Sequence, residues 1–447
     1  MQTALAPGLK LGWYGDDFTG AADTLATAAQ AGLRSLLFLG LPTPQRLARA
    51  GPLDALGIAG AARAMTPEQM QTELGPVAAL FARLAVPVLH YKVCSTFDSA
   101  PHVGSIGAAI DLLGRSVANR FIPIVGGQPS LGRYCVFGHL FARAGSDGEI
   151  HRIDRHPTMS RHPVTPMRES DLRLHLAAQG LDPVGLLSVL AYDEPPAALD
   201  ARLEALQAGG ARAVLLDAAR AEHLAPIGRL IWQRAHAQRL LAVGASSVVQ
   251  ALAAHWQTLG LMPLAPDRAG ENLAAAQGPV LVLAGSLSPV SRRQVAAASS
   301  YTRVSLDAAR MVADETGYAA ALARQVQQLL HQGRHVLAVT SEARSDADTP
   351  GTPALNSTTL AQACGRWLAD VLQAAPVRRL GIAGGDTSSH AVQALDAWGM
   401  SFLQAISPGV ALCRLHSDQA RLDGMEIVLK GGQMGSTELF EDLCHGR

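Results

Sequence analysis

Leu11-Gly12-Trp13-Tyr14-Gly15-Asp16-Asp17-Phe18-Thr19-Gly20-Ala21-Ala22-Asp23 is the stretch of sequence that decides the fold. Its first four residues predict a buried strand, and an acidic turn bounded by glycines follows them. Residues 21–31 have helical spacing, and the apolar run 34–39 predicts a second strand. The order strand, polar turn, helix, strand is typical of a parallel α/β sheet.

The same order of elements repeats along most of the chain. A helix is predicted over residues 67–83. Further strands are predicted at residues 56–59, 86–92, 121–125, 183–187, 213–217, 239–244, 279–284, 303–306, 335–340, 379–383, 411–415 and 425–430. We therefore predict an α/β protein with two α/β domains, each built on a mostly parallel sheet.

The 447 residues exceed what one ordinary hydrophobic core organises, so more than one domain is expected. A turn-rich, weakly apolar segment at 264–270 falls between two regular halves. We predict a first domain over 1–245, a connecting segment over 246–277 and a second domain over 278–447. Residues 126–170 are rich in glycine, proline, histidine and arginine, which is typical of a functional loop region.

The composition narrows the class of partner. Lys+Arg and Asp+Glu both number 37, so no basic excess favours nucleic-acid binding. The five cysteines form no CxxC pair, which argues against disulfides or a structural zinc site. Because the sequence shows no signal peptide and no apolar run of about 18 residues, we expect a cytoplasmic protein without a membrane partner. A homo-oligomer stays open.

Three strand-terminal loops in the second half are rich in glycine and small hydroxyl side chains. They are 284–289 before a helix expected at Val290, 383–389 before a helix expected at His390, and 430–437. Glycines and helix starts let backbone N–H groups approach an anion beyond the carboxyl ends of parallel strands. One such loop is usually only a tight connection, so it is the occurrence of three that favours a phosphate-binding site. Neither the P-loop nor the dinucleotide fingerprint is present.

The first polar candidate in the N-terminal half is the pair Asp16 and Asp17, followed by Thr19. Two carboxylates at a strand end can bind substrate hydroxyls or hold Mg²⁺ through water. The alternative is that Asp17 or Thr19 only caps the following helix. A cap explains one residue and leaves the pair unexplained, so we favour a site.

The second candidate is Lys92-Val93-Cys94-Ser95-Thr96-Phe97-Asp98-Ser99. A lysine followed by hydroxyl and carboxyl side chains suits a ligand that carries a carboxylate and several hydroxyls. A solvated strand end with a capping side chain is the open alternative. Cys94 has no base near it in the sequence, which favours a small buried residue over a nucleophile.

The third candidate lies in the irregular segment 126–167, whose arginines and histidines make an anion-seeking surface. Arg133 and His139 are its predicted substrate contacts. His139, His156 and His162 are conceivable zinc ligands, but their spacing matches no zinc site that we can justify.

With these segments assembled, the chain resembles the four-carbon acid sugar kinase family over nearly its whole length. Asp16-Asp17-Phe18-Thr19-Gly20-Ala21-Ala22-Asp23 is similar to the family's opening motif, and residues 92–99 are most similar to its 3-oxo-tetronate kinase branch. Further similar motifs are Gly138-His139-Leu140-Phe141, His162-Pro163-Val164-Thr165-Pro166-Met167, Gly285-Ser286-Leu287-Ser288, Gly384-Gly385-Asp386-Thr387 and Leu429-Lys430-Gly431-Gly432 through Gly435.

The resemblance implies a sugar-acid domain followed by an ATP domain, with the reaction in the cleft between them. The nucleotide contacts that it implies, with Ser288 and Gly435 added from the loop pattern, are Ser286, Ser288, Gly384, Gly385, Asp386, Thr387, Gly432 and Gly435. The substrate contacts that it implies, with the remaining polar candidates added, are Asp16, Asp17, Thr19, Lys92, Ser95, Thr96, Asp98, Arg133 and His139.

We therefore predict an ATP-dependent kinase that phosphorylates a terminal hydroxyl of a 3-oxo sugar acid, with Mg²⁺ bridging the phosphates. Asp17 and Asp386 are the candidate catalytic residues, and the metal ligands stay unassigned. Residues 126–133 depart from the 3-oxo-tetronate kinases, so 3-oxo-isoapionate, threonate and erythronate stay open as substrates. A nucleotide-binding sensor without turnover is the alternative from another class, although it would need no second polar site.

Overall fold

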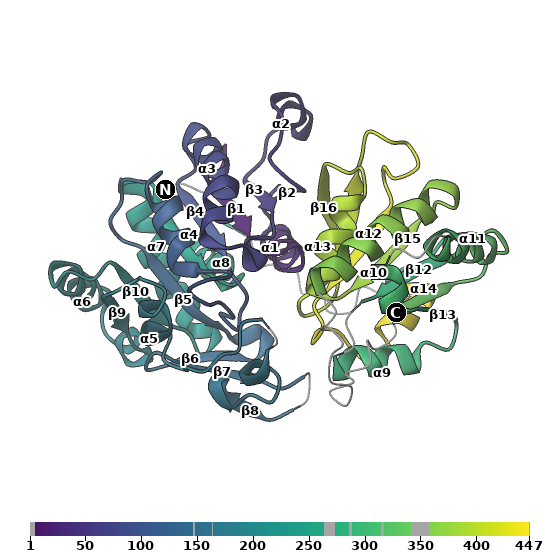
Figure 1. Cartoon of the computed structure of the whole chain (residues 1–447). Helices are drawn as coiled ribbons and strands as arrows, with labels where there is room; N and C mark the ends of the chain where they lie inside the picture. Colours follow the sequence, from purple (N-terminus) through teal and green to yellow (C-terminus); the bar gives the residue numbers. More distant parts are fainter. Residues whose placement is uncertain are drawn as a thin grey trace. The chain divides into compact units, whose positions relative to one another are not determined.

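A computed structural model describes residues 5–145, 148–162, 164–262, 273–285, 288–313, 317–340 and 357–446. The chain forms two compact units, Met1–Asp267 and Arg268–Arg447. Figure 1 draws the first unit in purple to teal and the second in green to yellow. No helix within the described ranges combines the length and apolar character needed to cross a bilayer.

The first unit is built on a parallel sheet with the strand order β2-β3-β1-β4-β11-β5-β10-β9. Its strands are β1 (Leu11–Gly15), β2 (Ser35–Phe38), β3 (Ala55–Ala59), β4 (Val88–Lys92), β5 (Pro123–Gln128), β9 (Val184–Leu187), β10 (Ala213–Asp217) and β11 (Leu240–Gly244). The strands β1, β3, β4, β10 and β11 are buried at every residue, as continuous apolar runs in a parallel sheet should be.

Helices connect these strands in the predicted βα order. They are α1 (Phe18–Gln30), α2 (Pro44–Ala50), α3 (Pro67–Arg83), α4 (Ile106–Gly114), α5 (Leu172–Ala177), α6 (Pro196–Ala208), α7 (Leu224–Ala237) and α8 (Ser247–Thr258). We expected a connecting segment from residue 246 onward, but α8 packs within the first unit. Trp256 of α8 meets Trp232 of α7 edge to face, with ring centroids 4.9 Å apart.

The segment 126–170, expected as an irregular loop, contains an antiparallel ribbon. The end of β5 pairs with β6 (Arg133–Val136), which pairs with β7 (His139–Arg143) and then β8 (Ile150–Arg152). Phe137 and Gly138 both have positive φ at the β6–β7 turn, and the Asp217 carboxylate accepts both of their N–H groups, at 2.6 and 3.0 Å. A tertiary contact therefore supports a hairpin turn that lacks the usual Asn-Gly signal.

The second unit has the strand order β13-β14-β12-β15-β18-β17-β16, parallel as far as β18 and antiparallel beyond it. Its strands are β12 (Val280–Ala284), β13 (Thr302–Leu306), β14 (Val336–Thr340), β15 (Arg379–Ala383), β16 (Gly399–Ser407), β17 (Val410–His416) and β18 (Glu426–Lys430). Its helices are α9 (Pro289–Ala297), α10 (Ala308–Val312), α11 (Tyr318–His331), α12 (Ser357–Ala374), α13 (Gly385–Ala394) and α14 (Leu439–His445). Strand β16 was not predicted, because it is only partly buried along most of its length.

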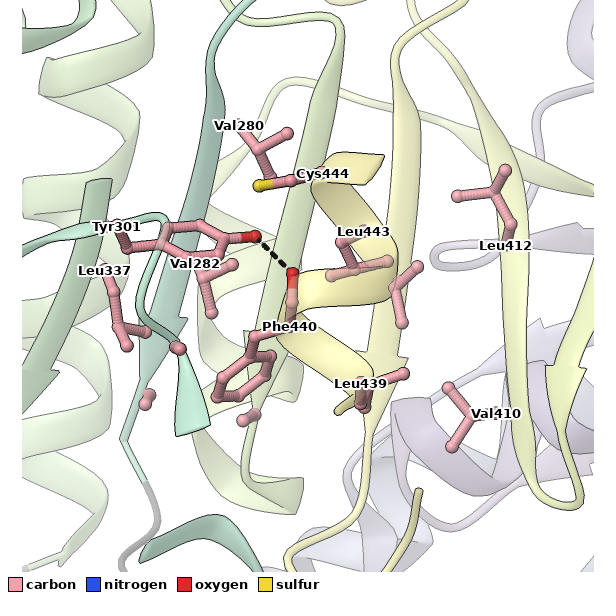
Figure 2. Close-up of a cluster of buried hydrophobic side chains, with 14 of the residues drawn as sticks. Val280, Val282, Tyr301, Leu337, Val410, Leu412, Leu439, Phe440, Leu443 and Cys444 are labelled. Carbon is pink, nitrogen blue, oxygen red and sulfur yellow. Dashed lines mark hydrogen bonds between the residues drawn. The ribbon is translucent and has the colours of Figure 1, made fainter. Parts of the chain in front are cut away.

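The C-terminal helix α14 seals the core of the second unit. Figure 2 shows Phe440 and Leu443 among the buried valines of β12, with Tyr301 beside them. The Tyr301 hydroxyl donates a hydrogen bond of 2.7 Å to the Phe440 carbonyl, so the one polar atom that this tyrosine brings into the core is satisfied. This packing supports the edge of the sheet at which the glycine-rich loops begin.

Candidate functional site

Asp16 and Asp17 directly follow β1, at the carboxyl edge of the first sheet. Asp17 is the N-cap of α1: its Oδ1 accepts the Gly20 N–H at 2.8 Å, and its Oδ2 accepts the Thr19 hydroxyl at 2.6 Å. Asp17 therefore does cap α1, as the alternative reading of the sequence predicted. This role leaves Asp16 to be explained, because Asp16 takes no part in the cap.

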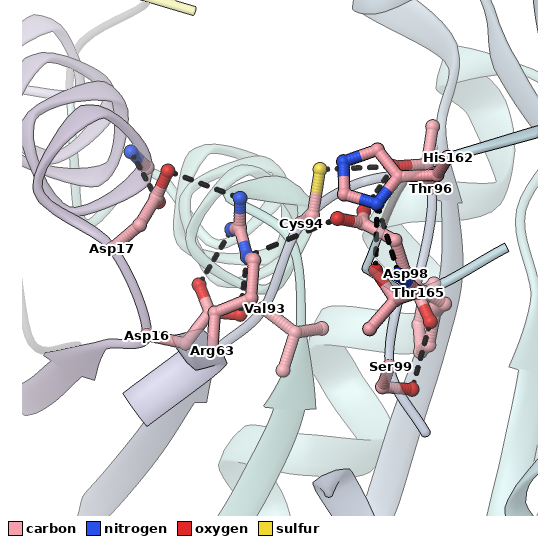
Figure 3. A network of polar contacts seen from close by, with 12 residues as sticks. Asp16, Asp17, Arg63, Val93, Cys94, Thr96, Asp98, Ser99, His162 and Thr165 are labelled. Atoms are coloured by element: carbon pink, nitrogen blue, oxygen red, sulfur yellow. Dashed lines mark hydrogen bonds and ion pairs between the residues drawn. The ribbon is translucent and has the colours of Figure 1, made fainter. Parts of the chain in front are cut away.

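Arg63 binds both carboxylates. It lies in the 3₁₀ turn Ala62–Ala64, which follows β3. Its Nη2 and Nε donate to the two oxygens of Asp16 at 2.8 and 3.1 Å, and its Nη1 donates to Asp17 Oδ2 at 3.1 Å (Figure 3). Sequence reasoning missed Arg63. The available signal was a lone basic side chain after a buried strand.

The pKa values of the two carboxyl groups are shifted in opposite directions. Burial would raise the pKa of Asp17, but Arg63 and Lys92 outweigh it and hold that pKa below its ordinary value. For Asp16 burial prevails over the attraction of Arg63, so its pKa is raised. A Cβ on Gly20 would lie 2.6 Å from Lys92 Nζ and 2.5 Å from Asp17 Oδ1, so only glycine leaves room for the ammonium beside this carboxylate.

Asp98 extends the same polar network beyond β4. The Thr96 hydroxyl donates to Asp98 Oδ1 at 2.5 Å, and Arg63 Nε lies 4.0 Å from Asp98 Oδ2. Burial would raise the pKa of Asp98, but Arg63, Thr96 and His162 together lower it. Burial raises the pKa of the Cys94 thiol to about 11, which makes this cysteine a poor nucleophile at neutral pH. Ser95 is also buried here.

Arg133 stands opposite Gln128 at the start of the antiparallel ribbon. Its Nη1 donates to the Leu131 carbonyl, and in the part of the chain that the structure describes it forms no ion pair with a carboxylate. Burial lowers its pKa, against the attraction of Asp23 and Asp98. A largely buried guanidinium without a carboxylate partner is suited to binding an anionic ligand.

The predicted histidine contact is not part of this network. His139 Nδ1 lies 2.9 Å from the Ser170 hydroxyl instead. His156 Nδ1 accepts the Met159 N–H, and His162 Nδ1 accepts the Thr165 N–H. Among the described residues, no three histidine, cysteine or carboxylate side chains gather as metal ligands would.

The three predicted loops of the second unit begin side by side. They leave the carboxyl ends of β12, β15 and β18, which are neighbours in the sheet. The Gly285 N–H donates to the Ala383 carbonyl at 3.0 Å, and the Gly384 N–H donates to the Lys430 carbonyl at 2.9 Å. A Cβ on Gly285 would collide with the Thr387 side chain, which shows how closely the first two loops approach.

The helix after the second loop begins earlier than expected. We predicted its start at His390, but α13 begins at Gly385, so Asp386 and Thr387 lie in its first turn. Gly384, with φ +120°, is the N-cap. The first N–H groups of a helix have no partner within it, so this helix start can receive a phosphate. The predicted contact Ser286 lies outside the described residues.

The third loop is attached to α9. Ser288 caps α9 by accepting the Ser291 N–H at 3.1 Å, and its hydroxyl donates to the Gly432 carbonyl. Gly435 has φ +87°, and a Cβ there would lie 2.8 Å from Leu439 Cδ2. The loop thus takes a conformation that only glycine adopts without strain at this position.

The Arg63 network gives a prediction about stability. Replacing Arg63 with Met leaves two buried carboxylates uncompensated, which should cost about 3–5 kcal/mol in the free energy of unfolding near neutral pH. The cost should shrink as the pH falls, because without Arg63 burial raises the pKa of both carboxyls, and their protonation then relieves the uncompensated charge. Urea unfolding at about pH 7.5 and about pH 5 measures both effects.

Arg34→Met is the matched control, because Arg34 also binds a carboxylate, that of Asp54, but is 55% exposed. It should change stability far less than Arg63→Met. An equal loss in the two variants, or a loss for Arg63→Met that does not depend on pH, would contradict the assigned role of Arg63.

Comparison with protein families divides the chain as the two units do. Residues 11–252 match the sugar-binding N-terminal domain, and residues 281–440 match the nucleotide-binding C-terminal domain. A 3-oxo-isoapionate kinase of Paraburkholderia graminis is 40% identical, over 100% of this chain and 96% of the relative. A 3-oxo-tetronate kinase of Methylobacterium radiotolerans is 32% identical, over 97% of this chain and 98% of the relative.

Solved structures share the fold along almost the whole chain. A Salmonella typhimurium LT2 protein described as a candidate tRNA synthase is 25% identical with a TM-score of 0.74, over 97% of this chain and 98% of that one. A Haemophilus influenzae protein is 23% identical with a TM-score of 0.67, over 96% and 98% of the two chains. The resemblance found in the sequence motifs is confirmed, and the chain belongs to the four-carbon acid sugar kinase family.

Proposed function

We propose that this protein transfers the γ-phosphoryl group of ATP to a hydroxyl of a small 3-oxo sugar acid, and that 3-oxo-isoapionate is its substrate. One observation carries this choice: the 3-oxo-isoapionate kinase relative is 40% identical over the whole chain, whereas two 3-oxo-tetronate kinases are 32% and 30% identical. The departure of residues 126–133 from the 3-oxo-tetronate kinase pattern supports the same choice.

The nucleotide side of the reaction belongs to the second unit. Its linked loops offer glycine backbone and the start of α13 to the phosphates of ATP. Asp386 is exposed in the first turn of α13, where its carboxylate could hold Mg²⁺. The ion would neutralise charge on the phosphates, and the surrounding N–H groups would keep them in place for transfer.

The acceptor side belongs to the first unit. Arg133 and Lys92 supply positive charge for the substrate carboxylate, and Ser95 and Thr96 supply hydroxyl groups for its oxygens. Asp17 is held by its cap and by Arg63, and its lowered pKa makes it a weak base. We therefore assign Asp17 to substrate orientation, and either Asp17 or Asp386 to accepting the hydroxyl proton.

A panel of acceptors tests the function. We expect ADP release with ATP and 3-oxo-isoapionate to exceed that with 3-oxo-tetronate, threonate or erythronate in kcat/KM. Faster release with 3-oxo-tetronate would move the assignment to that substrate. Binding of ATP with no release above background for any acid would favour the nucleotide sensor.

Charge removal tests the two candidate catalytic carboxylates. Asn also caps helices, so Asp17→Asn should keep α1 in place while removing the charge. We expect Asp17→Asn and Asp386→Asn each to lower kcat, by roughly 10²-fold for the residue that takes the proton. Asp370→Asn, at an exposed position of α12, is the control and should keep wild-type turnover. Wild-type kcat in both test variants would refute the assignment.

Removal of the unpaired arginine tests the acceptor site. Arg133→Met should raise KM for the sugar acid by about 10- to 100-fold, because a hydrogen-bonded charge pair with the substrate carboxylate is lost. KM for ATP should stay unchanged. Arg155→Met is the matched control, since Arg155 belongs to the same segment but is 77% exposed. An unchanged KM for the acid would remove Arg133 from the site.

A further inference from the structure

Lys430 is a buried lysine that none of the roles above uses. It ends β18, is 1% exposed, and leads directly into the third glycine-rich loop. Its Nζ donates to Gln294 Oε1 at 2.5 Å, to the Ser291 hydroxyl at 3.0 Å and to the Gly432 carbonyl at 3.5 Å. No carboxylate pairs with it in the described part of the chain. A buried cation without a counterion is costly, so an arrangement that keeps one calls for an explanation.

The buried side chain of Gln294 completes the attachment of this loop. Its Nε2 donates to the Met434 carbonyl at 3.0 Å and to the Ser436 carbonyl at 2.8 Å. The Gly432 carbonyl accepts from Ser288 and, at 3.2 Å, from Ser291. Every second carbonyl from Gly432 to Ser436 is therefore turned toward α9.

The orientation of these carbonyls fixes the direction of the N–H groups between them. In a trans peptide unit the C=O and the N–H of the next residue point in opposite directions. The N–H groups of Gln433, Gly435 and Thr437 therefore point away from α9 and its side chains. Backbone N–H groups that face one way, here those of every second residue, can together donate to an anion.

We propose that Lys430 and Gln294 are positioning residues that turn the N–H groups of the loop 431–437 outward to bind nucleotide phosphates, with the Lys430 ammonium as a buried positive charge behind them. The inference rests on the proposed nucleotide site of this unit. It adds to that site two residues whose side chains face the back of the loop.

The titration of Lys430 supports this arrangement. Burial lowers the pKa of Lys430 to about 7, and no neighbouring charge offsets the effect. The side chains that face its Nζ, Ser291 and Gln294, are both uncharged. The pKa of Lys430 is shifted by burial and by none of the ionisable residues on the elements around it. These are Arg292 and Arg293 of α9, Arg379 of β15, Asp386 and His390 of α13, Glu438 before α14, and Glu441, Asp442, Cys444 and His445 within α14.

A bound phosphate would change that titration. Negative charge on the loop favours the ammonium form, so the pKa of Lys430 rises when a nucleotide binds. Nucleotide binding above pH 7 then takes up a proton. The contribution of Lys430 to affinity is fully present below about pH 7 and is lost as the pH rises through the pKa of the bound form.

Calorimetry of MgADP binding tests the proposal. Titrations at about pH 8 in two buffers of different ionisation enthalpy measure the protons taken up, and we expect uptake by the wild-type protein. Lys430→Met should abolish it and weaken ADP binding about tenfold near pH 6.5, with a smaller difference near pH 9. Gln294→Leu should weaken binding at every pH while keeping the proton uptake.

Lys10→Met is the matched control. Lys10 is a lysine of the first unit that is also buried, at 4% exposed, but its ammonium group pairs with the Asp54 carboxylate. It should leave ADP affinity and proton uptake unchanged. Wild-type binding of ADP without proton uptake would overturn the role of Lys430 and leave the kinase assignment standing. Failure of the wild-type protein to bind ADP or ATP would overturn the proposed nucleotide site, and this inference with it.

Discussion

The parallel arrangement of strands is the constraint on which both sites depend. Strands that run in the same direction end at the same edge of their sheet, and the turns that follow them meet there. In the first unit this edge brings Asp16 after β1 close to Lys92 at the end of β4. In the second unit it joins the turns after β12, β15 and β18 by backbone hydrogen bonds. Each site is thus assembled from segments that are distant in the sequence.

The two units solve opposite electrostatic problems at these edges. The first unit buries several carboxylates and compensates them with Arg63, which binds Asp16 through two nitrogens and Asp17 through a third. The second unit buries the Lys430 ammonium with neutral oxygen partners only. A sugar acid needs both hydrogen-bond acceptors and positive charge, whereas nucleotide phosphates need donors and positive charge. The different charge arrangements fit the two ligands that we propose for these units.

The repeated strand and helix pattern predicted most of the fold, because buried parallel strands are apolar at every position. The predictions deviated where burial was partial or where a distant residue decided the conformation. Strand β16 is only partly buried along most of its length, which left its apolar signal weak. The hairpin after β6 depends on Asp217, a residue of another strand. Helix α13 begins among polar residues that the sequence pattern assigned to a loop.

The sequence by itself determined the α/β class, the polar turns at the strand ends and the family resemblance, since apolar periodicity and local motifs are properties of short segments. Only the tertiary structure decided which polar residues act together. Arg63 carried no motif of its own, yet it is the partner of both aspartates. Lys430 belongs to the motif Leu429-Lys430-Gly431-Gly432. Its burial without a carboxylate partner, and its contact with Gln294 of α9, depend on the fold. The reason is that burial and charge pairing depend on neighbours in space, which local sequence does not specify.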